Sequence, residues 1–195
     1  MIRCSFAFLL LSATLALAHP HIFMDAEANL VFNEKGFEGV QNHWVFDELY
    51  SKAMLESVDK DKDGKLNSEE TKALQKIILP PILKFSYYNY LALGSKFVPP
   101  SQIADFTASF KQGKLILLFL TRFNIPASEN YTMLLLAVTD PTNYIQITPD
   151  LNKSKINAPP NLDVEYFVDS LKGMTLFDGF SAQIQGIYIR FRKVQ

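Results

Sequence analysis

The sequence predicts a mainly β protein, in which a β-sandwich-like domain is interrupted by one helix–loop–helix insert at about residues 47–80. Aromatic residues are frequent, with 16 Phe and 8 Tyr among 195 residues, and such side chains suit the pleated, half-buried surfaces of sheets. Short segments with strand-like alternation recur along the chain. The insert is the one stretch whose apolar residues follow a helical period instead.

The first strand is predicted at residues 22–32, where apolar and polar side chains alternate. Turn-forming residues follow at 33–36, and residues 40–46 return as a second strand. The apolar face of the first strand comprises Ile22, Met24, Ala26, Ala28, Leu30 and Phe32.

Asp47 is the expected N-cap of the first helix of the insert. The second helix is predicted from about Ser68 to the proline pair Pro80 and Pro81, which should end it. The first helix should present one apolar face, which contains Tyr50, Met54, Leu55 and Val58.

Strand signals resume after the insert and suggest a sandwich of many short strands. We expect one domain at residues 19–195, with two subdomains as the alternative. The predicted strands are 87–93 with 96–98 as a hairpin, 103–110 with 115–123 as another, then 131–138, 144–148, 163–168 and 183–192.

The amino terminus resembles an export signal at residues 1–18. Arg3 is followed by an apolar run that is short for a membrane span, and small residues precede His19. The single cysteine, Cys4, lies inside this signal. We therefore expect cleavage, a periplasmic location, and a mature protein that carries no thiol and does not span the membrane. A retained membrane anchor is the alternative.

Charge and motifs exclude several classes of function. The chain has 19 Lys and Arg against 20 Asp and Glu and no basic stripe, so nucleic acid is not an expected partner. The sequence contains no recognisable nucleophilic triad and no glycine-rich phosphate loop. These observations favour a binding protein over an enzyme.

Residues 59–70 match a calcium-binding EF-hand loop at every position. Calcium takes six to eight oxygen ligands, and this spacing offers them. Gly64 permits the sharp turn, and Leu66 is the apolar residue that tethers such a loop to a core. The predicted ligands are Asp59, Asp61, Asp63, the carbonyl of Lys65, Asn67 through water, and Glu70. An acidic, solvated loop without a metal is the alternative.

The loop is expected to act as a structural brace rather than a switch. Sensor EF-hand proteins pair two calcium loops and expose a methionine-rich groove. This chain has a single EF-hand loop and 5 Met in all. Extracellular modules also bind calcium weakly, so their occupancy varies little.

Cleavage before His19 would expose a second candidate site for nickel, cobalt, zinc or copper. The free amine and ring of His19 and the ring of His21 are the proposed ligands, helped by a carboxylate such as Asp25 or Asp47. Pro20 has no N–H, so the square-planar site built on successive backbone amides is excluded. A histidine pair without metal is the alternative. His43 should lie nearer Ala26 than His21 across the hairpin.

Four blocks of sequence, at 19–26, 44–48, 59–70 and 138–144, together resemble an uncharacterised bacterial periplasmic family. That family is usually labelled the periplasmic component of an ABC-type transport system, and its members are often encoded beside nickel/cobalt-type metal transporters. The resemblance implies a periplasmic role in transition-metal handling, with a membrane metal transporter as partner. Its candidate functional positions are His19, His21, Trp44, Asp47 and Asp140.

The leading hypothesis is an exported calcium-binding protein that acts as a transition-metal-binding accessory to a membrane metal transporter. The alternative is a calcium-braced protein-interaction module that binds no transition metal. An enzyme that holds copper through an amino-terminal histidine is a third hypothesis, although no second catalytic group accompanies it.

Overall fold

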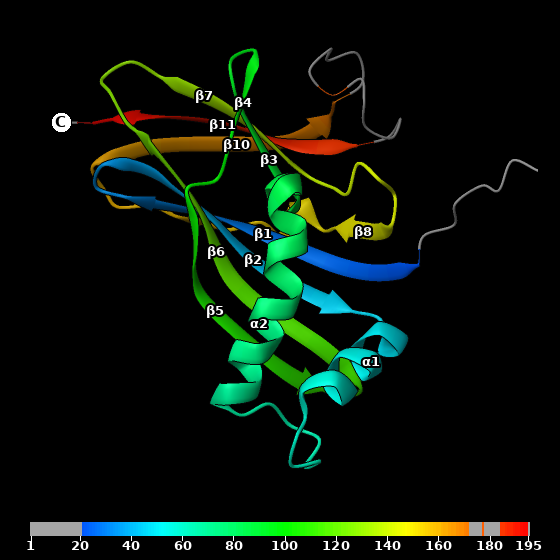
Figure 1. Cartoon of the computed structure of the whole chain (residues 1–195). Coiled ribbons are helices and arrows are strands. Elements are labelled where there is room, and N and C mark those ends of the chain that lie inside the picture. The colour runs from blue at the N-terminus through cyan, green and yellow to red at the C-terminus, as the bar shows by residue number, and fades with distance from the viewer. Residues whose placement is uncertain (1–20, 172–176, 178–183, 195) are drawn as a thin grey trace, which may run out of the picture.

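The computed structural model describes residues 21–171, 177 and 184–194. Within them, strands form two sheets, and a helix–loop–helix lies against one of the sheets (Figure 1). The predicted signal peptide and His19 lie outside the described residues. No helix in the described part of the chain is both long enough and apolar enough to cross a membrane.

In the described residues, the first sheet contains six strands in the order β5-β6-β2-β1-β8, with β9 also paired to β1. The core of this sheet is antiparallel, whereas β8 and β9 both run parallel to β1. Its strands are β1 (Ile22–Asn33), β2 (Gly36–Phe46), β5 (Gln102–Lys111), β6 (Lys114–Pro126), β8 (Ile145–Pro149) and β9 (Ile156–Asn157).

The second sheet has five strands among the described residues, in the order β10-β11-β7-β3-β4. Each neighbouring pair in it is antiparallel. Its strands are β3 (Asn89–Leu93), β4 (Lys96–Val98), β7 (Thr132–Val138), β10 (Leu162–Ser170) and β11 (Gln185–Lys193).

The two sheets share one hydrophobic core, which confirms the predicted sandwich-like fold. All six apolar residues of the predicted inner face of β1 are buried, because only one side of that strand faces the core. Phe32 of β1 meets Phe191 of β11 edge to face, with 5.3 Å between ring centroids. This contact joins the first sheet to the second.

The insert contains α1 (Glu48–Val58) and α2 (Ser68–Ile82). Asp47 is the N-cap of α1, as predicted. On α2, Leu74, Ile78 and Ile82 recur every four residues and are buried, so one helix face packs on the core. Leu66, just before α2, also packs against the core and tethers the loop as expected.

The proline pair does not end α2 where predicted. The helix includes Pro80 and Pro81 and ends at Ile82, and the backbone N–H of Leu83 then donates to the carbonyl of Pro80. Proline has no N–H, so Pro80 and Pro81 cannot donate to the carbonyls of Lys76 and Ile77, and the last turn of α2 lacks these two backbone hydrogen bonds.

After α2 the chain forms a 3₁₀ segment, η1 (Leu83–Tyr88), with an unusual backbone. Ser86, Tyr87 and Tyr88 have φ angles of 54°, 51° and 57°. This left-handed run delays β3, which begins at Asn89 instead of residue 87 as predicted. A second short 3₁₀ segment, η2 (Leu151–Lys153), follows β8.

The second strand begins four residues earlier than predicted, at Gly36. Gly39 lies inside it because β6 crosses closely there: a Cβ at this position would stand 2.1 Å from the carbonyl oxygen of Thr121. The glycine therefore marks a close approach of two strands rather than a turn.

Candidate metal centre and pocket

Three aspartates of the loop between α1 and α2 converge on one point. Asp59, Asp61 and Asp63 each place a carboxylate oxygen within 4.8 Å of the other two. No other set of three His, Cys, Asp or Glu donors meets this spacing among residues 21–171, 177 and 184–194. Three such oxygens in a turn of this kind can hold a metal ion.

Backbone N–H groups orient these carboxylates. Gly64 donates to Oδ2 of Asp59 over 3.0 Å, and Lys65 donates to Oδ1 of Asp63 over 2.8 Å. Gly64 adopts a φ of 75°, which permits the sharp turn predicted from the sequence. The loop thus fixes the direction of its acidic side chains through its own backbone.

The charges in the loop repel one another. A hydrogen bond from the backbone of Asp63 lowers the pKa of Asp61, but this effect is outweighed. Partial desolvation, together with the neighbouring carboxylates of Asp63, Glu70 and Asp59, raises the pKa of Asp61 above its ordinary value. A cation placed among these groups would relieve that repulsion.

One carboxylate oxygen of the loop has no partner among the described residues. Oδ1 of Asp59 is buried and accepts no hydrogen bond from any described residue. A buried carboxylate oxygen without a partner is costly, and a bound cation would satisfy it. The residues present therefore fit a bound metal ion.

Glu70 closes the loop in a different way from the three aspartates. Its side chain is buried, and its oxygens accept from the backbone N–H groups of Lys60 over 2.8 Å and of Asn67 over 3.0 Å. The side chain of Asn67 caps α2 in return, which completes a capping box. The roles of Glu70, Asn67 and the Lys65 carbonyl as calcium ligands stay predictions.

The candidate transition-metal residues are not gathered in the described structure. His21, just before β1, and Asp25, on β1, are both exposed, but a rise of about 3.4 Å per residue separates their Cα atoms by roughly 13 Å. Asp47 accepts hydrogen bonds from the N–H groups of Phe23 and Tyr50, over 2.8 and 2.9 Å. The structure leaves a joint role with His19 untested, because His19 is outside the described residues.

His43, the third histidine, stands away from His21 as expected. It lies opposite Glu27 in the register of β1 and β2, next to the pair formed by Ala26 and Trp44. Its Nδ1 is 3.6 Å from a carboxylate oxygen of Glu27.

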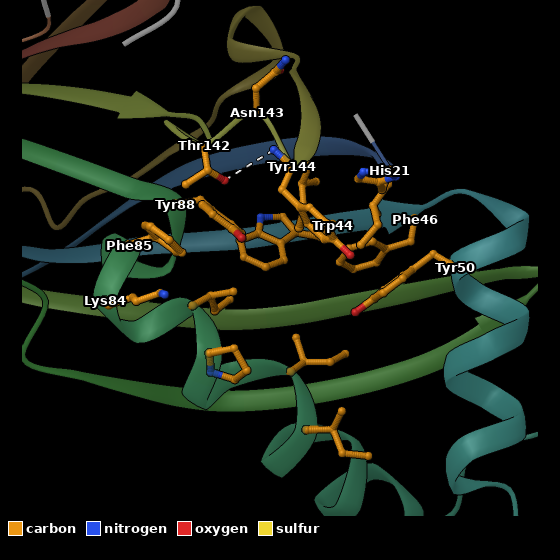
Figure 2. Close-up of a pocket in the computed structure, with 16 residues that line it drawn as sticks. His21, Trp44, Phe46, Tyr50, Lys84, Phe85, Tyr88, Thr142, Asn143 and Tyr144 are labelled. Carbon is orange, nitrogen blue, oxygen red and sulfur yellow. Dashed lines mark hydrogen bonds between the residues drawn. The ribbon is translucent and has the colours of Figure 1, made fainter. Parts of the chain in front are cut away.

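A pocket of about 550 Å³ opens beside His21, between the start of β1, the end of α2, η1 and the segment leading into β8 (Figure 2). Trp44 and Phe46 of β2 and Tyr50 of α1 line it, and they face Tyr88 and Tyr144. The pocket therefore joins residues from distant parts of the chain.

Both aspartates that the resemblance points to support the walls of this pocket from behind. Asp140 is buried; its Oδ1 accepts from the N–H and hydroxyl of Thr142, over 2.9 and 2.7 Å, and its Oδ2 accepts from the N–H of Ile145 over 2.9 Å. These bonds form the predicted turn and present Tyr144 to the pocket. Asp47 likewise fixes the N-terminus of α1, which carries Tyr50.

No individual signal in the sequence marks Tyr50, Lys84 or Tyr88 as pocket residues. Tyr144 belongs to one of the blocks that carry the family resemblance, and His21 and Trp44 belong to two others. These three blocks of sequence meet at the pocket. Their membership in the family pattern is therefore the one feature of the sequence that could have indicated this site.

Comparison with known proteins agrees with the resemblance in its coarse form. The family model described as "Protein of unknown function (DUF1007)" matches residues 4–166. A search of curated proteins found no match. Because the matched segment covers most of the chain, including the acidic loop and the pocket, this protein belongs to the DUF1007 family of proteins of unknown function.

Proposed function

We propose that this chain is an exported calcium-binding protein that handles a transition metal as an accessory to a membrane metal transporter. The observation that carries the calcium part is the convergence of Asp59, Asp61 and Asp63, with one buried Asp59 oxygen left without a partner. The proposal is of a binding protein rather than an enzyme.

Calcium is the metal that the donor set favours. The loop offers carboxylate, amide and carbonyl oxygens and neither imidazole nor thiolate. Such hard ligands suit calcium or magnesium, and the twelve-residue spacing with glycine at the sixth place supports calcium.

Calcium would act as a brace between two helices that are fixed elsewhere. Oγ of Ser51 accepts from the N–H of Leu115 over 2.8 Å, which ties α1 to β6. On the other side of the loop, Leu74 and Ile78 bury α2 in the core. A filled loop would hold the ends of α1 and α2 at a fixed separation.

The transition-metal part rests on His21 and the predicted cleavage before His19. The ring of His21 is exposed at the rim of the pocket and makes no hydrogen bond with the described residues, although it contacts the ring of Tyr144 at 5.2 Å. A free imidazole beside a free terminal amine suits nickel, cobalt, zinc or copper. Processing in the periplasm would create that amine.

Calorimetric titration with Ca²⁺ and Mg²⁺ tests the brace. We expect Ca²⁺ to bind in the range of extracellular modules, about 10⁻⁴–10⁻³ M, and Asp59→Asn and Asp63→Asn to weaken it by tenfold or more. Glu56→Gln removes a charge from α1, outside the loop, and serves as the control. Equal weakening in the control, or no calcium binding by the unchanged protein, would contradict the proposal.

Titration with Ni²⁺, Co²⁺, Zn²⁺ and Cu²⁺ tests the amino-terminal site. The protein should be purified from the periplasm, with its first residue established by mass spectrometry. We expect binding that is lost in a His19→Ala, His21→Ala variant and kept in His43→Ala.

The alternative function, a calcium-braced interaction module, is favoured by the distance between His21 and the carboxylates. It predicts the same calcium result but no difference between the histidine variants. It also predicts that a tag left on the amino terminus leaves the activity intact.

A further inference from the structure

We infer that the pocket beside His21 binds a small aromatic carboxylate, independently of either metal. The pocket volume of about 550 Å³ lies within the range typical of small-molecule sites. Its occupant is defined by three properties of the walls: aromatic surface, unused hydrogen-bond donors and positive charge.

Aromatic rings form much of the wall and favour a planar, apolar body. Trp44 packs edge to face on Phe119 behind it, with 4.6 Å between centroids, and is fixed in place. Phe85 and Tyr88 stack nearly parallel, with an angle of 11° between their rings. Ile77, Ile78 and Ile82 of α2 complete the apolar side.

The polar groups on the walls are mostly donors without acceptors. No hydrogen bond within the described residues uses the hydroxyls of Tyr50, Tyr88 or Tyr144. In Figure 2 the hydroxyls of Tyr50 and Tyr88 extend into the space between the elements. The pKa of Tyr50 is raised to about 12, mainly by burial and to a smaller extent by the nearby Tyr144 and Asp47. This phenol therefore keeps its proton and can donate it in a hydrogen bond.

The indole N–H of Trp44 is a further unused donor. It is buried and has no hydrogen-bond partner among the described residues. Trp44 is itself 1% exposed and lies against Tyr88, with 6.0 Å between ring centroids. Because this nitrogen is buried, it marks a fixed ring in the wall, and the donors open to a ligand are the tyrosine hydroxyls.

Charge selects an anion. Lys84 lines the pocket, its ammonium nitrogen lies 4.8 Å from the centroid of the Phe85 ring, and it forms no ion pair with a described residue. No Asp or Glu side chain lines the pocket within the described residues. Asp47 and Asp140 lie behind the wall. Asp47 already accepts two hydrogen bonds, and Asp140 already accepts three.

Calorimetry with a matched pair of compounds tests this assignment. The probes are 2-naphthoate and its neutral analogue 2-naphthamide, which share the same planar body. We expect naphthoate to bind roughly two- to fivefold more tightly, the size of a partly exposed charge interaction. Trp44 is the single tryptophan of the chain, so a change in its fluorescence would report occupancy of this pocket.

Three variants locate the binding. Lys84→Gln should abolish the preference for naphthoate, whereas Lys76→Gln, an equal change of charge on an exposed part of α2 that does not line the pocket, should keep it. Ile77→Trp should fill the cavity and remove binding of both compounds; Ile77 is 44% exposed, so this change spares the core.

Equal binding of the two compounds would overturn the assignment of an anion, and binding unaffected by Ile77→Trp would overturn the site. Absence of binding by either compound to the folded protein, established by circular dichroism, would overturn the proposal as a whole. None of these outcomes depends on calcium or on the amino-terminal histidines, so they are separate from the tests of the proposed function.

Discussion

The carboxylate of Asp47 joins the end of β2 to the beginning of β1 through Phe23. Its Oδ2 accepts from the N–H of Phe23 over 2.8 Å, while the N–H of Asp47 donates to the carbonyl of Phe23 over 2.9 Å. The other oxygen, Oδ1, caps α1 by accepting from Tyr50. One side chain thus holds a strand, a helix and a wall of the pocket together.

Replacement of Asp47 by alanine should destabilise the protein. The loss of an N-cap costs about 1–2 kcal/mol, and the N-terminal turn of α1 would also lose its favourable negative charge. The stability of Asp47→Asn should lie between that of the unchanged protein and that of Asp47→Ala, because the amide oxygen of Asn can accept one of the two hydrogen bonds. Urea denaturation measures the difference. Asp25 is exposed on β1, and its side chain forms no hydrogen bond with a described residue. Asp25→Ala should therefore change stability little, and an equal effect there would contradict this role of Asp47.

Calcium should stabilise the fold, and its removal should reverse the effect. Free calcium at one hundred times the dissociation constant adds about 2.7 kcal/mol to the free energy of unfolding. We expect a higher midpoint of thermal unfolding in calcium than in EDTA, and no such shift for Asp59→Asn. A calcium-dependent shift of equal size in that variant would show that calcium acts elsewhere.

Alkaline pH should destabilise the protein partly through Tyr50. The pKa of this phenol is raised to about 12 in the folded state by burial, then by Tyr144 and Asp47, against about 10 in the unfolded chain. The folded state therefore binds the proton more tightly. The resulting stability, on the order of 2 kcal/mol, is present below pH 10 and is lost as the pH rises towards 12.

Comparison of the unchanged protein with Tyr50→Phe isolates this effect. The variant keeps the ring and lacks the titrating group. Urea denaturation at pH 8 and at pH 11.5 should show a smaller loss of stability for Tyr50→Phe than for the unchanged protein. Identical losses would mean that Tyr50 titrates normally.

Asp140→Ala should unfold the segment that leads into β8. It would leave the N–H of Ile145, which is buried, without its acceptor, and it would free Thr142. A hydrogen bond to a charged group contributes about 1.5–3 kcal/mol, so we expect a loss of roughly 3 kcal/mol in urea denaturation and altered Trp44 fluorescence. Glu129→Ala is the control, because Glu129 is exposed and its side chain forms no hydrogen bond with a described residue.

Local patterns in the sequence predicted most of the elements. Asp47 as an N-cap and the acidic loop are short-range signals, and their geometry depends on residues a few positions apart. The inner face of β1 was equally clear because only one side of that strand is buried.

The failures have local causes that composition does not reveal. Ser86, Tyr87 and Tyr88 carry no turn signature, so their left-handed backbone could not be expected. The pocket was missed because Trp44, Tyr88 and Tyr144 come from elements that meet only in the folded chain. A periodic pattern reports which face is buried, and it does not report what that face meets.

The parallel pairing of β8 with β1 has a consequence for how the protein is made. Ile22 pairs with Ile145, and Ala26 pairs with Pro149. A chain that emerges from its amino terminus completes β1 early, yet the wall of the pocket that contains Tyr144 cannot form until β8 has also emerged. Such long-range closure is slow, so the ability to bind a ligand should be acquired only near the end of synthesis and folding.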